Sequence, residues 1–113
     1  MSSDDPTRRY RRFAAMVLVG DQADTVELCR RCAEELQVLC KYCQLDDAAS
    51  TATRWRPFAL LADETTCQDA KPELEKVAQV VGAELIILTN TMTRDREGSL
   101  MPVLRGARER LRA

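Results

Sequence analysis

Residues 13–21 read Phe-Ala-Ala-Met-Val-Leu-Val-Gly-Asp, an unbroken apolar run that ends at Gly20 and Asp21. A continuous apolar run of this length is typical of a strand that is buried on both faces. Strands of this kind occur almost only in parallel sheets that are covered by helices on both sides. The segment therefore indicates an α/β fold.

Strand-like and helical patterns alternate along the rest of the chain. The expected strands are residues 13–19, 38–43, 58–62 and 84–88. The expected helices are residues 24–36, 46–54, 72–81 and 102–111. Asp24 with Glu27 is expected to cap the first helix, and Pro72 and Pro102 are expected to open the last two.

Strands that alternate with helices imply right-handed crossovers and a parallel sheet with helices on both faces. We expect a single α/β domain over residues 13–113, built as a three-layer sandwich with a four-stranded parallel sheet. Residues 1–12 are polar and carry four arginines, so we expect a flexible basic tail there.

The composition excludes several classes of chemistry. The chain has 113 residues, with 17 Lys and Arg against 18 Asp and Glu, and it contains no histidine. Catalytic Ser-His-Asp and Cys-His arrangements and histidine metal sites are therefore excluded. The near-zero net charge makes nucleic acid an unexpected partner, and we expect the arginines of the last helix to lie on a solvated face. These arginines are Arg105, Arg108, Arg110 and Arg112.

We expect no membrane partner and a cytoplasmic location. The apolar runs are shorter than the roughly 20 residues of a membrane helix, and the N-terminus lacks the apolar core of a secretory signal. The chain also lacks the glycine-rich and Walker patterns by which nucleotide-binding domains hold phosphates.

Polar residues stand at the ends of the expected strands. Ligands of parallel α/β sheets bind at the carboxyl ends of the strands, which selects Asp21, Asp63 and Thr89. Two converging carboxylates are a plausible Mg²⁺ site, and the Thr89 hydroxyl could contact an anion held there. The alternative is that each Asp only forms a turn or caps the next helix.

The order of these residues resembles the receiver domain of two-component response regulators, over roughly residues 13–90. The matching elements are Met16-Val-Leu-Val-Gly-Asp21, the strand that ends at Asp63, and Leu85-Ile-Ile-Leu-Thr89 after Val81-Gly82-Ala83. The resemblance implies a flavodoxin-like fold. It also implies that Asp63 is the phosphoacceptor, Asp21 a magnesium-binding carboxylate and Thr89 the switch residue.

The chain also departs from the receiver pattern. Gly20 replaces the first of two acidic residues, and the segment after Asp63 lacks the usual Pro and Gly. The sequence after Thr89 is too short for a helix, a fifth strand with Lys-Pro and a further helix. Met101, in the segment 100–103, stands where the phosphate-binding lysine would be. We therefore expect a shortened sheet of four strands, with a vestigial fifth strand at 100–103 as the alternative.

These departures favour a degenerate pseudo-receiver that is not an enzyme and acts in signalling or as a scaffold by protein–protein interaction. The alternative is a phosphorylatable receiver with Asp63 as acceptor and Asp21 as the magnesium ligand. Without a fifth strand, the fourth strand is an edge with unpaired backbone groups. We therefore expect a homodimer or a bound protein partner, unless the last helix covers this edge.

Two Cys-x-x-Cys pairs, Cys29 with Cys32 and Cys40 with Cys43, have the spacing of a zinc or iron–sulfur site. Cys29 and Cys32 share a helix face, but residues three apart in a strand point to opposite faces. Cys40 and Cys43 therefore cannot converge, and we expect no zinc site and no cofactor except Mg²⁺ at Asp21 and Asp63 as an open possibility. Cys67 is expected in a loop, as the most exposed thiol.

Overall fold

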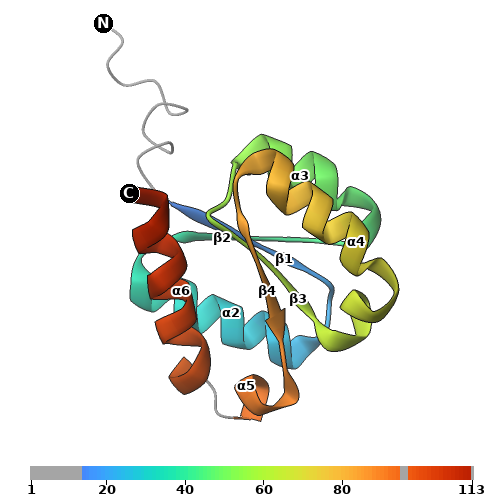
Figure 1. Ribbon diagram of the computed structural model, residues 1–113. Helices are drawn as coiled ribbons and strands as arrows, with labels where there is room; N and C mark the ends of the chain where they lie inside the picture. The colour runs from blue at the N-terminus through green and yellow to red at the C-terminus, as the bar shows by residue number, and fades with distance from the viewer. Residues whose placement is uncertain (1–13, 95–96, 113) are drawn as a thin grey trace, which may run out of the picture.

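Four parallel strands form one sheet in the computed structural model, which describes residues 14–94 and 97–112. The strands are β1 (Ala15–Val19), β2 (Leu39–Cys43), β3 (Ala59–Asp63) and β4 (Glu84–Leu88). Their order is β2-β1-β3-β4, so β1 and β3 are central and β2 and β4 are edges (Figure 1). This is the flavodoxin-like order without a fifth strand.

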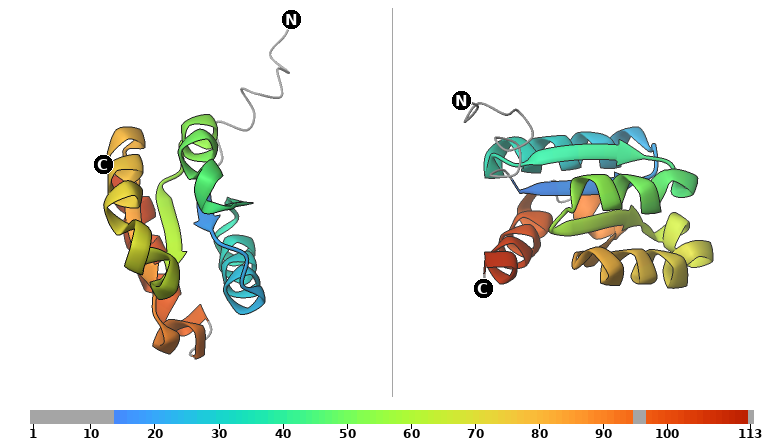
Figure 2. Two further views of the ribbon diagram at one scale, coloured as in Figure 1. Left: turned by 90° about the vertical axis from the view of Figure 1, so that its right-hand side faces the viewer. Right: turned by 90° about the horizontal axis from the view of Figure 1, so that it is seen from above.

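Helices cover both faces of the sheet (Figure 2). On one face, α2 (Ala23–Leu36) and α6 (Glu97–Arg112) pack against Met16, Leu18 and Leu61. On the other face, α4 (Glu64–Val81) and the start of α3 (Ala48–Trp55) pack against Val17, Val19 and Leu60. The short elements are η1 (Leu45–Asp47) and α5 (Asn90–Arg94). The expected three-layer α/β sandwich with a four-stranded parallel sheet is confirmed.

The burial of the central strands explains their sequence. Every residue of β1 is buried, and four of the five residues of β3 are fully buried. Alternate side chains of a strand point to opposite faces, so an unbroken apolar run supplies both layers of the core.

The segment 100–103 is helical, and the structure shows no fifth strand in the residues that it describes. Leu100, Met101, Leu104 and Ala107 are buried on one side of α6. This spacing is that of a helix face, so the alternative of a vestigial strand is wrong. Pro102 lies inside α6 and does not open it.

The helix expected from Pro72 begins eight residues earlier, at Glu64. The Asp63 side chain accepts a hydrogen bond from the Thr66 amide and so caps the helix directly after β3. Pro72 lies in the interior of α4, where it cannot donate to the carbonyl of Gln68. The buried residues before and after the proline share one face, which holds α4 on the sheet. They are Cys67, Ala70, Leu74 and Ala78.

Two smaller expectations need correction or fall outside the structure. Gln22 is the N-cap residue of α2, so Asp24 lies in the first turn and forms no capping box with Glu27. The expected tail, residues 1–12, lies outside the described residues. No helix in the described ranges is both long and apolar enough to span a lipid bilayer.

The central core should be sensitive to truncation. Leu61 is fully buried in β3, so Leu61→Ala should lower the free energy of unfolding by about 2–5 kcal/mol. Val80 is 69% exposed, so Val80→Ala should change it by less than about 0.5 kcal/mol. Urea denaturation followed by circular dichroism measures both. Equal losses in the two variants would contradict the described packing.

Candidate functional site

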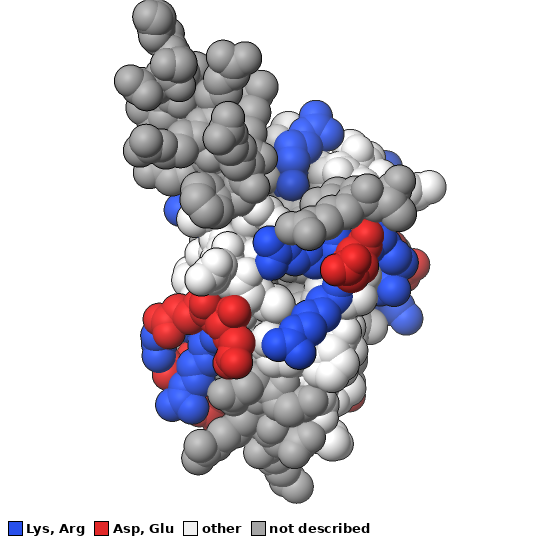
Figure 3. Space-filling view, turned by 90° about the vertical axis from the view of Figure 1, so that its left-hand side faces the viewer, with Lys and Arg blue, Asp and Glu red and all other residues white. Residues whose placement is uncertain are grey.

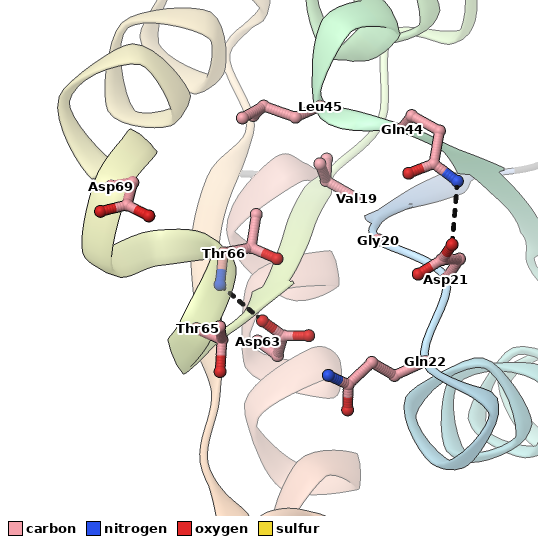
Figure 4. A pocket seen from close by; sticks show the side chains of 10 residues that line it. All are labelled: Val19, Gly20, Asp21, Gln22, Gln44, Leu45, Asp63, Thr65, Thr66 and Asp69. Atoms are coloured by element: carbon pink, nitrogen blue, oxygen red, sulfur yellow. Dashed lines mark hydrogen bonds between the residues drawn. The ribbon is translucent and has the colours of Figure 1, made fainter.

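A pocket of about 230 Å³ lies at the carboxyl ends of β1 and β3 (Figure 4). It is bordered by the ends of both strands and by the segments that follow β1, β2 and β3. The lining residues are Val19, Gly20, Asp21, Gln22, Gln44, Leu45, Asp63, Thr65, Thr66 and Asp69. The structure thus places Asp21 and Asp63, two of the three residues selected from the sequence, at one pocket.

Asp63 is the N-cap of α4. Its Oδ1 accepts a hydrogen bond of 2.7 Å from the Thr66 backbone N–H. This bond satisfies one of the four amides that a helix leaves unpaired at its N-terminus. The side chain expected to accept a phosphoryl group therefore already has a structural role.

Gly20 lies next to this carboxylate in a backbone conformation that favours glycine. Its φ is +129°, and its N–H donates to the Cys43 carbonyl at 2.9 Å. A Cβ atom at this position would lie 3.8 Å from Asp63 Oδ2. There is space for a side chain, but the positive φ would strain any L residue. This backbone therefore disfavours the acidic residue of the receiver pattern.

Asp21 is exposed, and its Oδ2 accepts a hydrogen bond of 3.3 Å from Gln44 Nε2. Gln44 follows β2, so this bond joins the segments after β1 and β2. In Figure 4 the bonded carboxylates of Asp21 and Asp63 face different partners, Gln44 and the start of α4.

Asp21 and Asp63 are two of the carboxylates of the magnesium site that the receiver resemblance implies, and they line one pocket. A third carboxylate of that site would stand at position 20, where this chain has glycine. Asp21 and Asp63 each already accept a hydrogen bond. Within residues 14–94 and 97–112, no group of three or more His, Cys, Asp or Glu is arranged to hold a metal ion.

Thr89 and Met101 do not line this pocket. The Thr89 hydroxyl accepts a hydrogen bond of 3.2 Å from the Met92 amide, at the start of α5. Met101 is 6% exposed and belongs to the core between α6 and the sheet. It therefore stands in no position equivalent to a phosphate-binding lysine.

The pocket is acidic. Its lining includes Asp21, Asp63 and Asp69, and none of its ten residues is Lys or Arg. The sequence patterns did not place five further lining residues at this pocket: Gln22, Gln44, Thr65, Thr66 and Asp69. The spacing of Asp63 and Thr66, an Asp three residues before the amide that it caps, is a signal that could have found one of them. Gln44 reaches the pocket only because β2 pairs with β1.

The cysteines divide between the two sides of the sheet. Cys29, Cys32 and Cys40 belong to or pack against the core beneath α2 and α6, whereas Cys43 packs against the core on the other face. Cys40 and Cys43 thus point to opposite faces, as their spacing in a strand predicts. Cys67 is 4% exposed and lies inside α4, so the expectation of an exposed loop thiol is wrong.

Two arginines of α6 are engaged within the chain. Arg108 Nη1 donates to the Leu36 carbonyl at the end of α2 at 2.7 Å, and Arg110 pairs with Glu84 at 2.8 Å. Figure 3 shows basic and acidic side chains side by side on the surface formed by α2 and α6. On α2, Glu27 contacts both Arg30 and Arg31, and these contacts hold the pKa of Glu27 at about 2. Because acidic and basic side chains are mixed, this surface is not uniformly basic, as binding to the phosphate backbone of a nucleic acid would require.

The capping role of Asp63 can be measured. Asp63→Ala should lower the free energy of unfolding by about 1 kcal/mol, because the Thr66 amide loses its acceptor. Asp63→Asn keeps an acceptor oxygen, so its free energy of unfolding should fall by much less. Urea titrations of the two variants beside the unmodified chain give the comparison. A larger loss in Asp63→Asn than in Asp63→Ala would rule out the capping role.

Burial raises the pKa values of Cys29, Cys40, Cys43 and Cys67. The unfolded chain therefore releases thiol protons first, near pH 8.5, and the free energy of unfolding should fall as the pH rises above that value. A thiol-reactive dye should modify the native chain slowly at neutral pH and all five cysteines in denaturant. Rapid modification of a native thiol at pH 7 would contradict this description.

Comparisons of the chain with family models, with curated proteins and with solved structures find no significant match. The resemblance to receiver domains therefore stays an expectation from the sequence.

Proposed function

We propose that this chain is a receiver-like signalling or scaffold module that performs no phosphotransfer and acts by protein–protein interaction. The observation that carries this proposal is the composition of the strand-end pocket. Its central carboxylate caps α4, and its lining contains three aspartates and no cation.

Electrostatics disfavours a phosphoryl group in this pocket. A phosphorylated side chain carries between one and two negative charges at neutral pH. The other aspartates of the pocket carry charge of the same sign, so they repel such a group. A receiver offsets this repulsion with a metal ion and a lysine. Here Gly20 stands in place of one metal-binding carboxylate, and none of the pocket's lining residues is Lys or Arg.

The cap constrains the orientation of Asp63. Its Oδ1 accepts from the Thr66 amide, so a phosphoryl group would be attached through Oδ2. This constraint alone would not prevent phosphorylation. Because the pocket lining also contains no Lys or Arg, we infer that the domain acts through its exposed surfaces.

The surface supports a binding role. Among the residues whose side chains the structure describes, three large apolar side chains are substantially exposed: Tyr42, Leu45 and Val80. Val80 is 69% exposed and borders an apolar hollow between α3 and α4. An apolar side chain in such a hollow gains from contact with another molecule.

Exposure to a small-molecule phosphodonor tests the proposal. The purified chain is incubated with Mg²⁺ and the donor, and its intact mass is measured with Asp63→Asn as the matched control. We expect no phosphoryl adduct that depends on Asp63. An adduct in the unmodified chain that is absent from Asp63→Asn would overturn the proposal and establish a phosphorylatable receiver with Asp63 as acceptor.

A further inference from the structure

We propose that two copies of this chain pair through the surface formed by α3 and α4, with the α3 helices antiparallel across a two-fold axis. The surface contains an apolar hollow of about 230 Å³. Its lining residues are Ala49, Thr53, Lys76, Val77, Val80 and Val81. This inference concerns assembly and does not depend on the absence of phosphotransfer.

The hollow and an exposed apolar side chain occur on the same surface. Val80 is 69% exposed, whereas Val77 and Val81 beside it are half-buried. A two-fold interface uses the same patch on both partners, so the patch must offer both a protruding group and a space for one. Val80 and the hollow between α3 and α4 meet this requirement.

The charges around α3 identify the occupant as a second copy. Asp46 and Asp47 immediately precede the helix, and Arg54 and Arg56 lie at its end. All four residues are exposed. With a rise of 1.5 Å per residue, the two charged ends lie about 10 Å apart. If the α3 helices of two copies lie antiparallel, the aspartates of each copy lie beside the arginines of the other. The two-fold axis then produces two such groups of opposite charges.

The exposed side of α3 permits close approach. Ala49, Ser50 and Thr53 are small, so a partner helix can pack near the backbone. The Ser50 hydroxyl donates to the Asp47 carbonyl at 3.1 Å, and the Thr53 hydroxyl donates to the Ala49 carbonyl at 2.8 Å. Both donors are already satisfied, so burying them leaves no hydroxyl hydrogen without an acceptor.

Sedimentation equilibrium of the full chain gives the first test. The apparent mass should rise with concentration from 12.7 kDa towards twice that value. Val80→Asp should abolish this rise, because it places a charge in the apolar contact. The control is Arg105→Asp on α6, an exposed residue outside the proposed surface, which should leave the rise unchanged. An apparent mass of one chain up to about 1 mM, or a dimer that persists in Val80→Asp, would overturn the proposal.

A charge exchange gives the second test. The double variant Asp46→Arg/Asp47→Arg has basic residues at both ends of α3, and Arg54→Asp/Arg56→Asp has acidic residues at both ends. Each variant alone should be monomeric, with a thermal unfolding curve that shows it is folded. An equimolar mixture should form a heterodimer. Failure of the folded variants to associate on mixing, or self-association of either one alone, would exclude the antiparallel arrangement.

Discussion

The two-sided burial of β1 and β3 is the constraint on which the rest of the structure depends. Both strands pair with a neighbour on each side, so their backbone groups are satisfied within the sheet. Their side chains alternate between the two helical layers. The central strands are the most completely buried, and β2 and β4 lie at the edges of the sheet.

This arrangement also fixes the location of the strand-end pocket. β1 and β3 are adjacent and parallel, so the residues that follow them, Gly20 and Asp21, and the last residue of β3, Asp63, meet at one edge of the sheet. The same connection limits what Asp63 can do. β3 passes directly into α4, and the first turn of the helix needs an acceptor, which Asp63 provides. The Oδ1 of Asp63 is bonded to the helix amide, while the side chain also lines the pocket.

Elements with a strong local sequence pattern could be predicted, whereas elements with a weak or misleading pattern could not. The four strands were predictable because each is a short apolar run with polar or turn residues after it. The start of α4 was missed because residues 64–71 bury only the small side chains of Cys67 and Ala70, and because Pro72 suggested a first turn. Pro102 misled in the same way, since packing of Leu100 and Met101 keeps the preceding turn of α6 helical. At the pocket, Asp21 and Asp63 followed from strand adjacency, but the place of Thr89 could not, because its hydroxyl caps α5.

The fold class, the positions of the four strands and the two aspartates at neighbouring strand ends can all be inferred from the amino-acid sequence. These features depend on apolar periodicity and on the connection between successive elements, and both are local. The tertiary structure alone decided that Met101 belongs to the core, that Gln44 reaches Asp21, and that Val80 and the charged ends of α3 share one surface. These relations join residues that are far apart in the chain. They exist only after the helices have packed on the sheet, because packing selects which faces are buried and which remain exposed.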